Sequence, residues 1–171
     1  MTNEEKVFGL GAGRLYIAPA SVSEEEARTL PYYAGPTKGG VTLTYTTKIH
    51  EITDYYGRLV RSLRYGERVR AEGRLSRLYP RILTALAGAA DAGGALSLGS
   101  VGESGRLVQL RAVLVCALPE EAGGGEFVFS MLATASEKLL LTLSSMHDSS
   151  VGFSLTGETD GAGFSGRMVF R

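Results

Sequence analysis

Apolar and polar residues alternate with a period of two along most of this chain, and glycine-rich stretches separate the alternating segments. This period is typical of β-strands, because successive side chains of a strand point to opposite faces of its sheet. In the clearest segment, Val41, Leu43 and Tyr45 alternate with threonines. The chain is therefore expected to be mainly β, with strands at residues 14–18, 41–46, 69–75, 107–118, 126–134, 138–143, 151–156 and 164–170.

A helical period occurs in one segment. Leu78, Ile82 and Leu86 recur at a spacing of four residues, with a proline near the start and a glycine after the end. These features predict a helix at residues 76–87, whereas residues 21–28 are expected to be a polar connection. One helix among many strands predicts a β domain with a helix packed against it, rather than an alternating α/β sheet.

The length of 171 residues fits a single domain, residues 1–171. Eighteen Lys and Arg balance eighteen Asp and Glu, so the chain as a whole has no strong field that would steer it to nucleic acid or to a membrane surface. The only cysteine, Cys116, cannot form an internal disulfide. No stretch approaches the ~18 consecutive apolar residues of a membrane span, so we expect a soluble protein without one.

Few residues are candidates for catalysis or for holding a cofactor. The glycines of residues 9–13 do not form a phosphate loop, because no strand is predicted before them and no Lys-Ser/Thr pair follows; a flexible lead into the first strand is expected. His50 and His147 stand in separate segments without a set of further metal ligands. Cys116 lies inside an apolar strand, where a small core residue is expected. We therefore expect neither an enzyme nor a bound cofactor or metal.

Arginine is concentrated in residues 58–81, which contain eight arginines and two glutamates. Three interpretations are open. The guanidinium groups bind phosphates along a duplex, or they form a solvated sheet face that discourages edge pairing. In the third interpretation they meet acidic groups of a neighbouring copy, at residues 24–26 or 120–121. A chain whose basic and acidic segments balance is well suited to associate with itself.

The order of motifs along the chain resembles that of a known family. Residues 13–19 read Gly-Arg-Leu-Tyr-Ile-Ala-Pro, and residues 39–45 read Gly-Gly-Val-Thr-Leu-Thr-Tyr. A long segment with Asp54 and Gly57 follows, and then the predicted return strand and helix. This order resembles the opening of bacteriophage tail tube (major tail) proteins, in which a Gly-x-Leu-Tyr-x-Ala-Pro strand and a Gly-Val strand lead into a long hairpin whose polar tip ends in an Asp and a Gly. The C-terminal half fits more loosely, through residues 110–118, 127–133 and 155–160.

The resemblance implies an antiparallel β-sandwich or barrel-like subunit with one α-helix. Six copies would close into a ring whose inner strands join into one continuous β-barrel, and rings would stack into a hollow tube through which DNA or an effector passes without specific binding. The implied location is the tail of a virion made in the host bacterial cytoplasm, or the tube of a phage-derived contractile injection device. The implied partners are further copies of the chain, together with sheath, tape-measure, baseplate and terminator proteins.

The resemblance also gives the polar segments a role. Residues 46–64 are too long and polar for an ordinary hairpin loop, so we expect an arm that orders only on a neighbouring subunit. This arm and the polar N-terminal segment are expected to contact the next ring. The arm residues expected at that contact are Lys48, His50, Glu51, Asp54, Tyr55, Tyr56 and Arg58.

The charged face of the predicted strand 69–75 is expected at contacts between subunits, because a lumen wall of unpaired arginines would bind DNA tightly. Its residues are Arg68, Arg70, Glu72 and Arg74. The alternative function is a monomeric β-barrel module that binds nucleic acid or another polyanion through residues 58–81.

Overall fold

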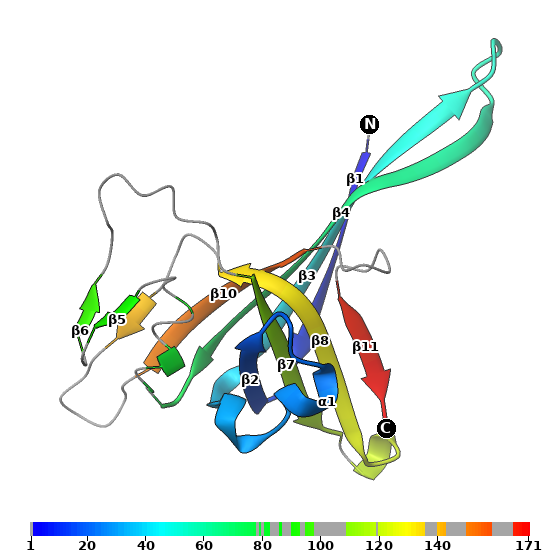
Figure 1. Cartoon of the computed structure of the whole chain (residues 1–171). Helices are drawn as coiled ribbons and strands as arrows, with labels where there is room; N and C mark the ends of the chain where they lie inside the picture. The colour runs from blue at the N-terminus through cyan, green and yellow to red at the C-terminus, as the bar shows by residue number, and fades with distance from the viewer. Residues whose placement is uncertain are drawn as a thin grey trace.

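The computed structural model describes residues 2–77, 79, 81–82, 86, 90–92, 95–97, 109–118, 120–135, 140–142, 150–158 and 166–171 (Figure 1). Within these described residues, the main sheet contains nine strands. They are β1 (Thr2–Leu10), β2 (Gly13–Pro19), β3 (Tyr33–Thr53), β4 (Leu59–Leu75), β7 (Gln109–Ala117), β8 (Glu126–Ala135), β9 (Leu140–Thr142), β10 (Ser150–Glu158) and β11 (Arg167–Phe170). Strands β5 (Ala90–Ala92) and β6 (Ala95–Ser97) form a separate two-stranded sheet. The α-helix α1 (Glu24–Ala27) and the 3₁₀ turns η1 (Leu30–Tyr32) and η2 (Glu120–Ala122) lie in connections.

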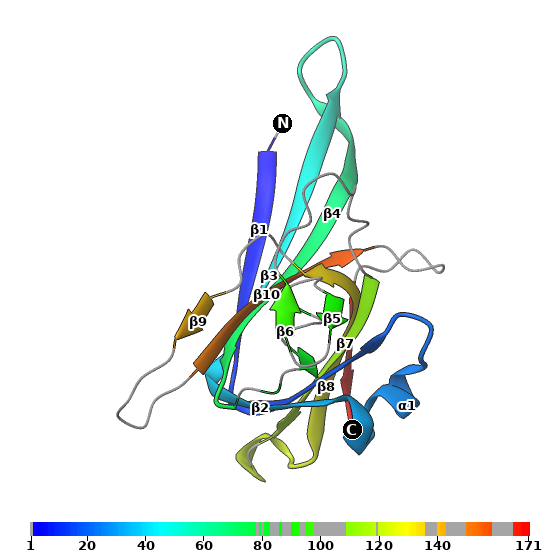
Figure 2. The same ribbon diagram turned by 60° about the vertical axis from the view of Figure 1, so that its left-hand side comes forward.

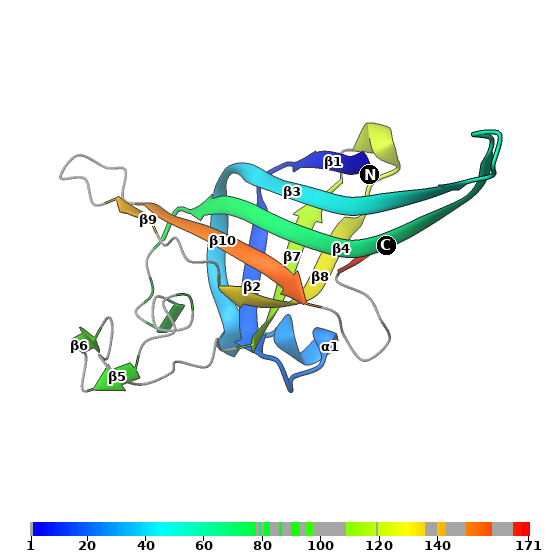
Figure 3. The same ribbon diagram turned by 90° about the horizontal axis from the view of Figure 1, so that it is seen from above.

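The main sheet closes on itself into a ring of strands. Strands β7, β2, β3, β4 and β10 are neighbours in that order, and β8 pairs with both β7 and β10 (Figure 3). All pairings are antiparallel. The prediction of a mainly β fold is therefore confirmed.

Strands β1 and β2 together follow β3 along almost its whole length. Gly11 and Ala12 lie between the two strands, while β3 bends at Gly39 and Gly40, which have φ of +81° and +107°. A Cβ on Gly40 would lie 2.5 Å from the carbonyl oxygen of Leu10. The prediction of a flexible lead at residues 9–13 was wrong, because these residues belong to two strands and the tight connection between them.

The main core fills the inside of the ring with alternate side chains of its strands. Leu15 and Ile17 of β2 and Leu43 of β3 are buried there, as is Phe153 of β10. On β4, the apolar face predicted from the alternation is buried: Val69, Ala71 and Leu75 belong to this core. Their charged neighbours Arg68, Arg70, Glu72 and Arg74 are exposed, so the two predicted faces of this strand are confirmed. Cys116 is buried in the same core, as predicted.

A second cluster lies on the outer face of β2, β7 and β8, beneath α1. Tyr16 and Val113 are buried there against Ala27 of the helix. The helix lies in the segment predicted as a polar connection. The Ser23 hydroxyl caps it by accepting a hydrogen bond from the Glu26 N–H at 3.3 Å. Strands β2 and β7 are consequently buried on both faces.

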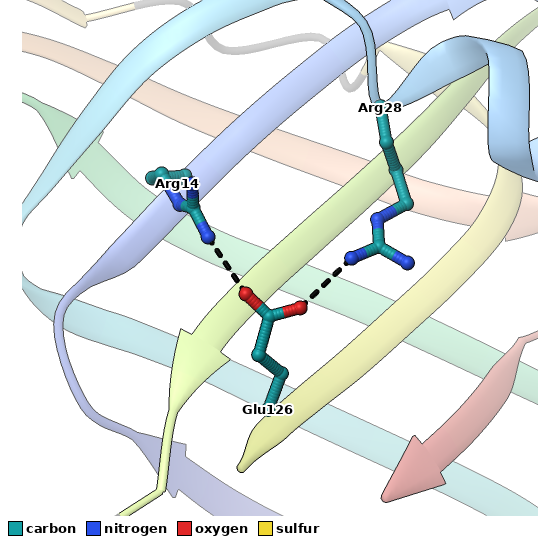
Figure 4. A network of polar contacts seen from close by, with 3 residues as sticks. All are labelled: Arg14, Arg28 and Glu126. Atoms are coloured by element: carbon teal, nitrogen blue, oxygen red, sulfur yellow. Dashed lines mark hydrogen bonds and ion pairs between the residues drawn. The ribbon is translucent and has the colours of Figure 1, made fainter. Parts of the chain in front are cut away.

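An ion-pair clamp fixes the segment that carries α1. The two carboxylate oxygens of Glu126 on β8 accept hydrogen bonds from Arg14 of β2 and from Arg28 after α1, each at 2.8 Å (Figure 4). The backbone of Glu126 also exchanges two hydrogen bonds with Arg171, at 2.8 and 2.9 Å. One residue therefore connects α1, β2 and the C-terminal strand.

The predicted helix at residues 76–87 is described only in part. Arg81, Ile82 and Leu86 have helical backbone, and the last two are buried in the main core. The Arg81 guanidinium donates hydrogen bonds to the carbonyl oxygens of Pro31 and Tyr33, at 2.7 and 2.9 Å. Residues 76, 77 and 79 are described and are not helical, so the predicted start of the helix at residue 76 was wrong. The Ser76 N–H instead donates to the Pro36 carbonyl oxygen at 3.0 Å. Residues 78, 80, 83–85 and 87 lie outside the described residues, as do His147, the turn at 160–161 and parts of the predicted strands at 107–118, 138–143 and 164–170.

Candidate interaction surface

A long hairpin projects from the ring. Strand β4 pairs with β10 only along residues 70–75, and β1 pairs with β3 only as far as Ile49. Beyond these points β3 and β4 pair with each other, and Figures 1 and 2 show them extending away from the rest of the chain. Residues 46–64 are called the arm below; they comprise most of this outer part, and residues 46–49 at its base still pair with β1.

The tip of the arm is a tight turn built around Asp54. Its carboxylate oxygen Oδ1 accepts hydrogen bonds from the backbone N–H groups of Tyr56 and Arg58, at 2.9 and 2.8 Å. Gly57 has a φ of +76°, a conformation that favours glycine. Asp54, one of the predicted contact residues, therefore shapes the turn from within.

The turn presents two tyrosines to solvent. Tyr55 is 97% exposed and Tyr56 is 82% exposed, and their rings meet edge to face with centroids 5.6 Å apart. A tyrosine adds a large apolar area with few rotatable bonds, so it is a favoured residue at protein interfaces.

Large apolar side chains continue down the arm. These residues are exposed by 39% to 65% and comprise Ile52, Leu59, Val60 and Leu63, with Tyr65 just beyond the arm. Contiguous exposed apolar side chains usually mark an interaction site. Sequence reasoning treated the arm as polar and missed these aliphatic residues. The run Leu59-Val60-Arg61-Ser62-Leu63 contains the signal that would have found them.

The other predicted arm residues are also at the surface. Lys48, His50, Glu51 and Arg58 are exposed on the arm. At its base, Arg64 lies 3.6 Å from Glu4 of β1, which also pairs with Lys6 at 3.4 Å. The N-terminal segment, predicted to face the next ring, is paired with β3 of its own chain through β1.

Tyr45 lies beside this charged base of the arm. Burial, a hydrogen bond with Glu67 and the charge of that carboxylate raise the pKa of the Tyr45 phenol. The phenol is therefore neutral at physiological pH and acts as a hydrogen-bonding partner. Its contact with Glu67 connects β3 to β4 where the arm leaves the ring.

The charged residues of β4 border a groove on the outer face of the ring. The groove has a volume of about 470 Å³. Its lining comes from β3, β4 and β10 and includes Lys38, Gly40, Arg70, Glu72, Arg74 and Ser154. Arg70 is held in place by Glu72 at 2.9 Å and by the Ser154 hydroxyl at 3.1 Å. Arg68 is exposed on the same face of β4.

The arginines of residues 58–81 therefore do not form one uniform surface. Arg64 and Arg70 each face a carboxylate, and Arg81 binds backbone carbonyls. Arg58 and Arg61 lie on the arm. These arginines are close together in the sequence, whereas the strand pairing places them at different sites with different partners.

The described residues offer little for catalysis or metal binding. They contain no group of three or more His, Cys, Asp or Glu side chains that could hold a metal ion. Burial raises the pKa of the Cys116 thiol, which disfavours the reactive thiolate. Among the described helical residues, no helix is long and apolar enough to span a membrane.

The chain matches no protein-family model, and a search of curated proteins finds no match. The interpretation of the arm and the groove therefore depends on their geometry and on the motif order of the sequence.

Proposed function

We propose that this protein is a structural subunit that assembles with copies of itself into a tail tube. In this account six subunits form a ring, the inner strands of the ring join into one continuous β-barrel, and rings stack into a hollow conduit. The conduit belongs to a phage tail or to a phage-derived injection device, and DNA or an effector passes through it without specific binding. Sheath, tape-measure, baseplate and terminator proteins are its further partners.

The observation that carries this proposal is the projecting arm with its exposed apolar side chains. A hairpin with Tyr55, Tyr56 and Val60 in solvent has more apolar surface than an isolated subunit needs, and burial of that surface favours association. Arginine and tyrosine, which are both frequent on the arm, are enriched at protein interfaces. The arm therefore suits a contact with another subunit.

Open strand edges support the same proposal. In the described part of the chain, β1 pairs only with β3, and residues 59–69 of β4 pair only with β3. Such edges expose backbone N–H and C=O groups that pair readily with another strand. Strand pairing between subunits would satisfy these groups and extend the sheet around a ring.

The polyanion-binding alternative is less well supported by the geometry. Tight binding to a duplex needs several cationic groups that are free to meet phosphates. Arg64 and Arg70 already face carboxylates, and Arg81 binds carbonyl oxygens. We propose no catalytic role for any residue.

Sedimentation velocity across a concentration series tests whether the arm drives association. For Val60→Lys, which places a charge among the apolar side chains of the arm, we expect an apparent dissociation constant at least about tenfold higher than for the wild type. Because Val60 is 65% exposed, the variant should fold, and circular dichroism verifies this.

Leu30→Lys is the matched control, because Leu30 is also an exposed aliphatic residue, 82% accessible, but lies far from the arm in the 3₁₀ turn η1. It should associate like the wild type. Equal association of both variants and the wild type would overturn the role of the arm. Steeply salt-dependent binding of the monomer to duplex DNA, with no self-association, would favour the alternative.

A further inference from the structure

The charged groups that line the groove on the outer face of the ring are mainly cationic. Its rim has three cationic side chains, from Lys38, Arg70 and Arg74, and one carboxylate, from Glu72. Glu72 lies 2.9 Å from Arg70, and the lining contains more cationic side chains than carboxylates. Guanidinium groups favour carboxylates and phosphates through paired hydrogen bonds. The groove is therefore suited to an acidic occupant.

The floor of the groove admits a protruding chain segment. Gly40 of β3 and Gly152 of β10 line it, and Thr42 and Ser154 contribute only short side chains. Its volume of about 470 Å³ falls in the range of sites that hold several side-chain groups. The contact of Arg70 with Glu72 and Ser154 holds its guanidinium in a fixed position, so little side-chain freedom is lost on binding.

An exposed acidic loop of the same chain has the complementary chemistry. Glu120 and Glu121 form the 3₁₀ turn η2, both are exposed, and neither carboxylate has an ion pair or hydrogen bond among the described residues. Residues 123–125 are glycines with positive φ, which make the loop narrow. The Leu118 N–H donates to the Gly125 carbonyl oxygen at 3.0 Å and closes the base of the loop.

Most of the other acidic candidates are already engaged. Glu24 accepts a hydrogen bond from the Ser130 hydroxyl at 2.7 Å, and Glu126 is held by two arginines. Glu25 and Glu26 are exposed on α1 but follow the outer face of β2 rather than forming a narrow projection. The loop at 120–125 is the better fit to a groove.

The loop and the groove of one chain do not meet. In Figures 1 and 3 the yellow-green loop before β8 lies well away from the junction of β4 and β10. A second copy must therefore supply the loop. A contact between two different surfaces of identical chains is heterologous, so it repeats from copy to copy and generates a ring or a filament.

We infer that Glu120 and Glu121 of one subunit dock into the groove bordered by Lys38 and Arg74 of the next. This inference rests on the proposed function and identifies one of its subunit contacts. The occupant of the groove is an acidic segment of a second copy, and the contact gives the assembly a direction. It also explains how a chain with equal numbers of acidic and basic residues attracts itself.

Charge reversal tests the contact from both sides. One variant combines Glu120→Lys with Glu121→Lys, and the other combines Lys38→Glu with Arg74→Glu. Each alone places like charges in the contact, so its apparent self-dissociation constant should rise at least about tenfold. In an equimolar mixture both contacts are complementary again, and association should return to within about threefold of the wild type. Sedimentation velocity at low salt measures all four samples.

Glu25→Lys combined with Glu26→Lys is the matched control, because it reverses an equally acidic and exposed pair on α1. It should associate like the wild type. The inference is overturned if the two charge-reversed variants fail to associate better together than apart, or if the control is the variant that loses association. Circular dichroism of each variant establishes that it is folded.

The outcomes separate this inference from the proposed function. If the wild type forms tubes and both charge-reversed variants still do so alone, the proposed function stands and the loop contact is wrong. If the mixture forms only pairs or short chains and the wild type never forms rings or tubes, the contact stands and the tube is wrong. Binding of a short DNA duplex that is lost on reversal of Lys38 and Arg74, without any self-association, contradicts both.

Discussion

Two adjacent glycines at the bend of β3 have similar backbone conformations but different surroundings. Gly39 has open space where a Cβ would lie, whereas a Cβ on Gly40 would meet the backbone carbonyl of Leu10. Backbone cannot move aside as easily as the end of a flexible side chain. The close approach of β1 to β3 therefore requires glycine at position 40 in particular.

Gly40→Ala should lower the free energy of unfolding by about 3 kcal/mol or more, because strain from a positive φ is added to a clash with Leu10. Gly39→Ala carries only the strain and should cost about 1–2 kcal/mol. Urea denaturation of both variants measures the difference. Equal losses would show that the approach of β1 to Gly40 does not constrain the bend.

Some single-residue features could be predicted from the sequence. The alternation in β4 correctly separated buried Val69 and Ala71 from exposed Arg70. It could not assign partners, because the pairing of Arg70 with Ser154 joins residues 84 positions apart. In the same way, Asp54 was recognised as part of a polar tip, but its bonding to two backbone N–H groups follows from the turn geometry.

At the scale of elements, the helix α1, which covers the outer face of β2, could not be predicted from the local sequence pattern. Tyr16 and Val113 are apolar and outward-facing, which indicates a second covered face. The helix α1 packs on that face, and its four residues are too few to give a helical period in the sequence. Only the cap signal from Ser23 to Glu26 marks it in the sequence.

Glu126→Gln weakens the clamp that connects α1, β2 and β8. Because all three side chains are partly exposed, solvent screens the pairs, and we expect a loss of about 0.5–1 kcal/mol in the free energy of unfolding. The difference should shrink at ~1 M salt. Urea denaturation at low and high salt measures it.

Glu25→Gln is the control for this change, since Glu25 is an exposed glutamate outside the clamp and outside the proposed loop contact. Its stability should match that of the wild type. A loss for Glu126→Gln that is insensitive to salt would mean that packing, rather than charge, holds the helix in place.

Strand β1 and the register of the arm were also beyond local prediction. Glu4, Glu5 and Lys6 interrupt the apolar alternation of β1, so its pairing with β3 decides its structure. The pairing of β3 with β4 shifts between Thr46 and Lys48, beside Gly66 with its φ of +61°. A single shift of register exchanges the two faces of a strand, and a period of two cannot reveal it.

At the scale of the whole molecule, the features that matter come from contacts distant in the sequence. Ring closure depends on the pairing of β8 with β10. The arm projects because β1 pairs with it only as far as Ile49 and β10 pairs with β4 only along residues 70–75. The groove gathers residues from three strands. Sequence patterns predicted the strands, whereas their arrangement around the ring required the structure.

The proposed contacts make the subunit directional, because they join different surfaces of neighbouring copies. The groove is lined by β3, β4 and β10. Figures 1 and 3 show the arm projecting from one region, while the loop before β8 and the junction of β4 with β10 lie at separate places. Contacts between unlike surfaces repeat without limit unless they close into a ring. A tube of stacked rings needs one contact that closes each ring and a second contact that joins each ring to the next ring.

Negative-stain electron microscopy of the full chain across a concentration series tests this central claim most directly. The account predicts stacked rings or hollow tubes whose length increases with protein concentration, and their loss in the Val60→Lys variant but not in Leu30→Lys. Particles no larger than a single subunit at every concentration, in the wild type as in both variants, would contradict it.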